Sequence, residues 1–133
     1  MSAVMADTHA VLWYLLGSSE LSPAARRAME DALRGGDPIY MASVSMVEIV
    51  YLANKHHTPA GLLARIISAL REEEPSLVLA PLDVEVTQAL PRVPRDQAPD
   101  MADRLIVATA LVRGLPLVTR NRRIRMDGLQ TIW

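Results

Sequence analysis

The sequence predicts an α/β fold: a mostly parallel central sheet of about four to five strands, with helices on both faces. Short apolar runs alternate along the chain with longer segments of helical periodicity. These runs are apolar throughout, as expected for parallel strands that are buried on both faces. The length of 133 residues fits one domain, and we assign residues 1–133 to it.

The first half of the chain contributes two strands and four helices. Ser22-Pro23 is an N-cap followed by proline at the first helical position, and Gly35-Gly36 ends the helix that follows. A serine, Ser43 or Ser45, is expected to cap the next helix. We expect strands at 3–6 and 39–42, and helices at 9–16, 24–34, 43–54 and from Thr58-Pro59 up to Pro75.

The second half repeats this alternation. We expect strands at 77–80, 117–119 and 129–133, a short helix at 83–90, and a longer helix from Asp100 or Met101 to Gly114. Residues 91–99 contain three prolines together with Arg92 and Arg95, which indicates an exposed loop. Residues 120–125 form a basic loop.

Composition excludes several classes of protein. With no cysteine there is no disulfide framework or thiolate chemistry, and we expect a cytoplasmic location. No apolar run reaches the roughly 18 residues of a membrane span, and the start of the chain lacks the basic region of a signal peptide. The net charge of −1 hides an asymmetry, because residues 91–133 carry eight arginines against four acids. This segment can form a face that attracts anions. The alternative is that these arginines are scattered and separately solvated.

Two acids stand alone in apolar runs. Asp7 directly follows the first strand, so we place it at the carboxyl edge of the sheet, where α/β proteins bind ligands. The alternative is that Asp7 is the N-cap of the next helix. Glu48 is the only charge between Met41 and Ala53, and helical spacing places it on an inward face with Val44, Val47, Tyr51 and Leu52. The alternative is a capping box, in which Glu48 reaches back to the amide of Ser45.

Two more acids open the helix near residue 100. Asp103 shares its face with Ile106, Val107 and Ala110, so we expect it to point inward, with Asp100 one turn earlier. The alternative is that Asp100 caps the helix while Asp103 favours its dipole. Inward acids at one edge of a sheet repel one another, which raises their pKa values unless a cation is present. Oxygen ligands without His or Cys favour Mg²⁺ or Mn²⁺ over zinc.

Four stretches carry a resemblance to a known family. These are Val4-Met5-Ala6-Asp7-Thr8-His9-Ala10-Val11-Leu12-Trp13, Ser43-Val44-Ser45-Met46-Val47-Glu48, Asp100-Met101-Ala102-Asp103-Arg104-Leu105-Ile106-Val107-Ala108-Thr109-Ala110 and Leu117-Val118-Thr119-Arg120-Asn121. In order, spacing and total length the chain resembles a PIN-domain protein of the VapC toxin type. The resemblance implies the PIN fold, metal-dependent ribonuclease activity, a homodimer, and a cognate antitoxin bound to the active-site groove.

Carried over by position, the resemblance implies that Asp7, Glu48 and Asp103 are the catalytic acids and hold Mg²⁺, with Mn²⁺ as a substitute. Asp100 becomes the accessory acid, although Met101 stands where the family usually has proline. At the last motif Asn121 replaces an acid of many relatives, so a second metal ion should bind more weakly. We therefore expect one tight metal site.

Most of the remaining candidate residues are expected to contact the substrate. Thr8 and Thr119 are placed to bind water or phosphate near the metal, although Thr119 could equally be a strand-end cap. The arginines expected to contact the RNA backbone are Arg92, Arg95, Arg120, Arg122, Arg123 and Arg125. We expect His9 to have a packing or surface role. We expect no metal site at His56-His57, because no third ligand lies nearby. Arg104 is expected to form an ion pair with Asp100.

Two other classes of function compete with the nuclease. A receiver-like phospho-acceptor domain would need a lysine near the last strand, but the only lysine is Lys55. A catalytically silent PIN-like binding module is compatible with Asn121, although the three principal acids argue against it. The apolar stripes at 11–16 and 62–70 exceed what a small sheet covers, which suggests partner surfaces.

Overall fold

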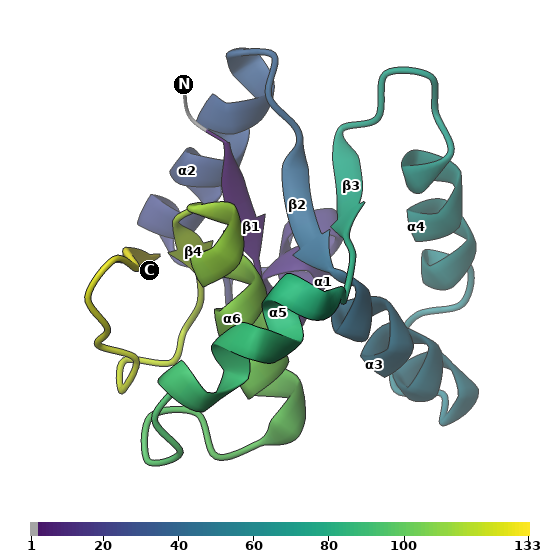
Figure 1. The fold of residues 1–133 in the computed structure, drawn as a ribbon. Coiled ribbons are helices and arrows are strands. Elements are labelled where there is room, and N and C mark those ends of the chain that lie inside the picture. Colours follow the sequence, from purple (N-terminus) through teal and green to yellow (C-terminus); the bar gives the residue numbers. More distant parts are fainter. Residues whose placement is uncertain (1–2) are drawn as a thin grey trace.

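The computed structural model describes residues 3–133, which form a five-stranded sheet in the order β3-β2-β1-β4-β5 (Figure 1). All four pairings between neighbouring strands are parallel. The strands are β1 (Val4–Ala6), β2 (Ile39–Ala42), β3 (Leu77–Ala80), β4 (Leu117–Val118) and β5 (Thr131–Ile132). The predicted α/β class and strand number are confirmed, and β1 is the central strand.

Helices cover both faces of this sheet. They are α1 (Thr8–Leu16), α2 (Pro23–Arg34), α3 (Ser43–Asn54), α4 (Leu62–Leu70), α5 (Val84–Ala89), the short 3₁₀ helix η1 (Leu90–Arg92) and α6 (Met101–Arg113). Figure 1 shows α5 and α6 in front of the sheet and α1 and α2 behind it. Strand β1 serves both layers, because Val4 and Ala6 pack into the core with α1 to α4 while Met5 packs into the core with α5 and α6.

Two glycines set helix boundaries. Gly114 ends α6 in the left-handed conformation, with φ of 66°, as the sequence predicts. The start of α4 differs from the prediction, because the helix begins at Leu62 and not at Thr58. Its N-cap is Gly61, whose φ of 85° is also left-handed and interrupts any helix that began earlier.

The predicted serine cap of α3 is wrong. The N-cap position is Ala42, which makes no side-chain hydrogen bond to the helix. Instead, the Ser43 hydroxyl donates to the carbonyl oxygen of Ala80 at 3.0 Å, which ties α3 to the end of β3. The Ser43 hydroxyl, which the local pattern predicts to cap α3, therefore bonds to a residue distant in sequence.

The proline-rich segment 91–99 is not simply an exposed loop. Val93 and Ala98 are buried in the core with α5 and α6. The Arg104 guanidinium donates to the carbonyl oxygens of Leu90 at 2.9 Å and Val93 at 3.4 Å. The predicted ion pair between Arg104 and Asp100 is therefore wrong, since Arg104 instead fixes the backbone at the start of this segment.

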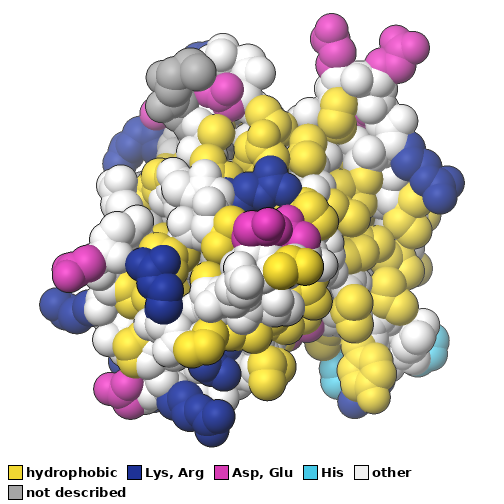
Figure 2. Space-filling view, in the orientation of Figure 1, with side chains coloured by type: hydrophobic (Ala, Val, Ile, Leu, Met, Phe, Trp, Pro, Cys, Tyr) yellow, Lys and Arg dark blue, Asp and Glu magenta, His cyan; other side chains and the backbone are white. Residues whose placement is uncertain are grey.

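Exposed apolar side chains follow the predicted stripes only in part, since Leu16 is exposed but most of its neighbours are not. Within 11–16 and 62–70, Val11, Leu12, Leu62 and Ile66 are buried in the core. Figure 2 shows apolar side chains gathered over α3, α4 and β3. In this region the exposed large residues are Val47, Val50, Tyr51, Leu79, Leu82 and Val84, which we call the α3–β3 apolar surface. None of the helices in the described part of the chain is long and apolar enough to cross a membrane.

Candidate active site

A cavity of about 420 Å³ opens where the central strands β1 and β4 end. After β1 the chain adds β2 and β3 on one side, and it later returns to add β4 and β5 on the other. Such a switch point leaves a crevice beyond the carboxyl ends of the strands. The predicted site residues that line the cavity are Asp7, Thr8, Glu48, Asp100, Asp103, Thr119, Arg120 and Asn121.

Asp7 both lines this cavity and caps α1. Its Oδ1 accepts a hydrogen bond of 2.9 Å from the amide of Ala10, so the N-cap alternative describes a contact that the structure contains. Burial raises the pKa of Asp7 above its ordinary value of 3.8, although hydrogen bonds from Thr119 and Ala10 act in the opposite direction. The negative charge of Asp103 raises it further. The Asp7 side chain therefore caps α1 and lines the cavity at the same time.

Glu48 is held by a chain of hydroxyl groups. The Thr8 hydroxyl lies 2.5 Å from Glu48 Oε1 and 2.9 Å from Ser45 Oγ. An ionised carboxylate only accepts, so the single Thr8 proton goes to Glu48 and Ser45 donates to Thr8. The capping-box alternative is wrong, because Glu48 contacts Thr8. The inward direction of Glu48 is correct, but Val47 and Tyr51, predicted to share its face, are each 64% exposed.

Asp103 and Asp100 occupy the first turn of α6 and its N-cap. Burial raises the pKa of Asp103, and the charges of Asp100 and Glu48 raise it further. Asp100 stands at the N-cap position but accepts no capping hydrogen bond through its side chain. The mutual electrostatic influence of Asp7, Glu48, Asp100 and Asp103 indicates that these acids form one negatively charged group in the cavity wall.

Asn121 joins two loops at this cavity. Its Nδ2 donates to the carbonyl oxygen of Gln97 at 2.9 Å, and its Oδ1 accepts from the amide of Arg123 at 3.0 Å. Its own amide donates to Thr119 Oγ1 at 3.2 Å. The Nδ2 end of Asn121 thus holds the basic loop against the proline-rich segment, while the Oδ1 end bonds within the basic loop.

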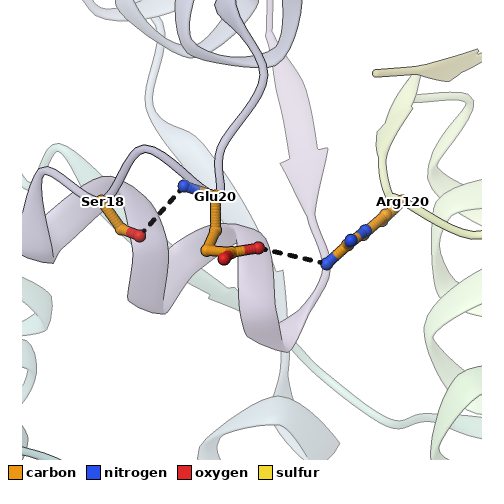
Figure 3. A network of polar contacts seen from close by, with 3 residues as sticks. All are labelled: Ser18, Glu20 and Arg120. Atoms are coloured by element: carbon orange, nitrogen blue, oxygen red, sulfur yellow. Dashed lines mark hydrogen bonds and ion pairs between the residues drawn. The ribbon is translucent and has the colours of Figure 1, made fainter.

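Of the predicted RNA-binding arginines, only Arg120 lines the cavity. Its Nη1 lies 3.4 Å from Glu20 Oε2, and the amide of Glu20 donates to Ser18 Oγ at 3.1 Å (Figure 3). The other arginines are exposed outside the cavity; they are Arg92, Arg95, Arg122, Arg123 and Arg125. Arg123 is nonetheless near enough to lower the pKa of Asp103.

Sequence reasoning missed several residues of the cavity. His9, Trp13 and Ile124 line it, and Ser45 and Gln97 hold its polar groups in place. The spacing of His9 and Trp13 could have signalled part of this, because residues four apart on a helix share a face. Gln97 could not be found in this way, since its role depends on contact between distant loops.

The donor set suits a hard cation. Carboxylate and hydroxyl oxygens surround a site in which two acids have raised pKa values, and a cation would offset the repulsion that raises them. Among residues 3–133, however, no three His, Cys, Asp or Glu side chains are arranged closely enough to hold a metal ion as they stand. Binding would require a rearrangement of these acids, of which Glu48 now bonds to Thr8 and Asp7 to the amide of Ala10.

Comparison with known proteins agrees with this fold. Residues 4–127 match the family model of the PIN domain. Ribonuclease VapC22 of Mycobacterium tuberculosis (strain ATCC 25618 / H37Rv) is 31% identical over 125 residues, which cover 94% of this chain and 92% of that protein.

Two solved structures share the fold. The VapBC2 structure from Rickettsia felis, bound to a DNA fragment from its promoter, superposes with a TM-score of 0.72 at 16% identity, covering 97% of this chain and 96% of that one. A toxin–antitoxin complex from Klebsiella pneumoniae gives a TM-score of 0.64 at 20% identity, covering 95% and 94%. The family model and the VapC relative, each matched over most of this chain, show that it belongs to the PIN domain family and is a PIN-domain protein of the VapC type.

Proposed function

We propose that this chain is a metal-dependent endoribonuclease that acts as the toxin of a toxin–antitoxin pair. The observation that carries the proposal is the cavity at the centre of the sheet, which brings Asp7, Glu48 and Asp103 together from three separate elements. The similar protein from M. tuberculosis is named a ribonuclease, and the similar structures from R. felis and K. pneumoniae are of toxin–antitoxin systems. We also propose that residues 1–133 form a single domain. The protein would act in the cytoplasm.

Three acids would hold the metal ion in this proposal: Asp7, Glu48 and Asp103. We propose Mg²⁺, with Mn²⁺ able to replace it. When bound by these acids, such an ion would acidify a water for in-line attack on a phosphodiester and would offset the charge on the departing oxygen. Thr8 keeps the Glu48 carboxylate oriented, and the Thr119 hydroxyl is placed to hold water or a phosphate oxygen at the same edge.

A single tight ion fits this chain better than two. Asn121 lacks the charge of a fourth carboxylate, and its side chain already bonds to Gln97 and Arg123. Asp100 remains as an accessory acid at the cavity wall. A second ion would therefore depend on the substrate phosphate for much of its binding, and two fully occupied ions in a crystal soaked in Mn²⁺ without RNA would contradict this.

The RNA backbone would follow the basic residues around the cavity. Arg120 lies in its wall, while Arg92, Arg95, Arg122 and Arg123 are exposed on the two loops that Asn121 joins. Contacts to phosphates release counterions, so binding should weaken steeply as salt concentration rises. These contacts carry no information about base sequence.

Partners would cover the α3–β3 apolar surface. Val47 and Tyr51 are each 64% exposed, and large apolar side chains gathered on one face are typical of protein interfaces. We propose that a cognate antitoxin and a second copy of this chain account for this exposure. A light-scattering mass at low protein concentration tests the homodimer.

Cleavage of cellular RNA tests the proposed function. The purified chain, freed of any partner, should cleave a pool of cellular RNAs with Mg²⁺ or Mn²⁺ and lose this activity in EDTA. Asp103→Asn should abolish cleavage while leaving the fold intact, whereas the neighbouring Asp100→Asn should retain part of the activity. An intact RNA pool under both metals would instead favour the silent binding module.

A further inference from the structure

Aromatic side chains line the same cavity as the acids. Trp13 and His9 lie one turn apart on α1, with ring centroids 5.3 Å apart and planes tilted by 39°. The Trp133 ring meets Trp13 edge-on, with centroids 5.8 Å apart. His9 is exposed and Trp13 is only partly buried, so part of this aromatic surface faces the cavity rather than the core.

Arg120 adds a flat cation to this surface. The Arg120 guanidinium carbon lies over the Trp13 ring, 5.6 Å from its centroid. Arg120 also pairs with Glu20, whose amide donates to the Ser18 hydroxyl in the turn after α1 (Figure 3). Glu20 and Arg120 are both well exposed, and such ion pairs are weak. The guanidinium carbon therefore lies over the Trp13 ring, and an incoming ligand can displace the acidic partner of Arg120.

The chemistry of these groups matches a nucleobase. Proteins that bind single-stranded RNA stack unpaired bases on aromatic rings and on arginine planes. A metal ion makes no use of aromatic rings, and core packing makes no use of an exposed histidine and arginine. The cavity also falls within the size range of sites for small molecules, about 300–1,000 Å³. It can thus hold a nucleotide beside the acids.

We propose that Trp13, His9 and Arg120 form a subsite that stacks an unpaired nucleobase of the RNA next to the phosphodiester held at the acids. This proposal rests on the proposed ribonuclease function and adds a reason for choosing single-stranded RNA. A base in a duplex is already stacked on its neighbours and cannot enter the cavity without being extruded.

The two tryptophans of the chain allow a direct test by fluorescence. In an Asp103→Asn background, which should keep the RNA intact, Trp133→Phe leaves Trp13 as the only tryptophan and Trp13→Phe leaves Trp133, so excitation selective for tryptophan reports on one ring at a time. A short single-stranded RNA should quench Trp13 strongly and Trp133 weakly. A ribose-phosphate oligomer of the same length without bases has the same charge, and it should bind more weakly and leave Trp13 unquenched.

Affinity provides the second measurement. Trp13→Leu should weaken binding of the intact RNA by about 5- to 100-fold and leave binding of the base-free oligomer unchanged, while Trp13→Phe should retain most of the affinity. Equal quenching and equal affinity for both oligomers would overturn the subsite. If the wild-type chain cleaves RNA while the oligomers behave alike, only the subsite fails; if it neither binds nor cleaves RNA, the ribonuclease function fails as well. Should Trp13→Leu not fold, the quenching of Trp13 decides.

Discussion

The Thr8 hydroxyl donates a hydrogen bond to the Glu48 carboxylate across 2.5 Å, joining the segment after β1 to the middle of α3. Thr8 is only 4% exposed and Ser45 is fully buried, so this contact lies at the sheltered end of the cavity. Short bonds between a hydroxyl and an ionised carboxylate are stronger than neutral ones. The Ser45–Thr8–Glu48 chain therefore presets the direction of one of the three principal acids.

Replacing Thr8 with valine should uncouple Glu48 from this chain. Valine keeps the shape but removes the donor to Glu48 and the acceptor for Ser45, so we expect RNA cleavage to fall by about 10- to 100-fold. The free energy of unfolding should fall by about 1–3 kcal/mol, because Ser45 loses its buried partner. Thr8→Ser restores the hydroxyl and should recover most of both quantities in cleavage assays and urea titrations. Cleavage by Thr8→Val at the wild-type rate would show that Glu48 needs no such support.

The stability of the metal-free chain should depend on pH through Asp103. Its raised pKa means that the native state binds this proton more tightly than the unfolded state does. The associated stabilisation is complete below the unfolded pKa and is lost as pH rises through the native pKa. In EDTA, the melting temperature of Asp103→Asn minus that of the wild type should therefore increase as pH rises from below 3.8 toward neutrality. A difference that stays constant across this range would contradict the prediction.

Magnesium should stabilise the folded chain in the absence of RNA. A ligand that binds only the native state adds about 2.7 kcal/mol when its concentration is 100 times its dissociation constant. Thermal unfolding at increasing Mg²⁺ should show this rise in the wild type and little rise in Asp103→Asn. Asp127 is exposed and outside the cavity, so Asp127→Asn serves as the matched control and should respond like the wild type. An equal response of all three proteins would mean that Mg²⁺ binds elsewhere.

Restoring an acid at position 121 should weaken the metal-free fold. Asn121→Asp removes the donor to the Gln97 carbonyl oxygen and adds a negative charge to a cavity already lined by acids. We expect the free energy of unfolding in EDTA to fall by about 1–3 kcal/mol. Mn²⁺ should then stabilise the variant more than the wild type, because a second ion gains a carboxylate ligand. If the variant equals the wild type in EDTA, the link between the two loops has little energetic weight.

The sequence predicted those parts of the site that depend on chain order. Asp7 and Asp103 could be placed because one follows a strand and the other opens a helix, and both positions meet at the carboxyl edge of a parallel sheet. Glu48 could be directed inward because an isolated charge in an apolar helix needs a partner. That partner, Thr8, lies forty residues away in sequence and was not identifiable from spacing.

Local patterns failed where a tertiary contact competed for the same group. Ser43 matched a helix cap but donates to Ala80, and Arg104 matched an ion pair with Asp100 but donates to the backbone of Leu90 and Val93. In both cases the local bond would be exposed to water and worth little, whereas the tertiary bond satisfies a carbonyl oxygen that packing has shielded. Helix propensity and residue spacing do not predict which carbonyl oxygens the folded chain shields from water.

The strand order has a consequence for the biosynthesis of the chain. Met5 of the central strand pairs with Leu117, so one flank of β1 is completed only by residues from the far end of the sequence. A nascent chain that has not yet released β4 from the ribosome lacks Thr119, Arg120 and the inner wall that they provide. The cavity that holds Asp7, Glu48 and Asp103 is therefore complete only after β4 has been synthesised and has paired with β1.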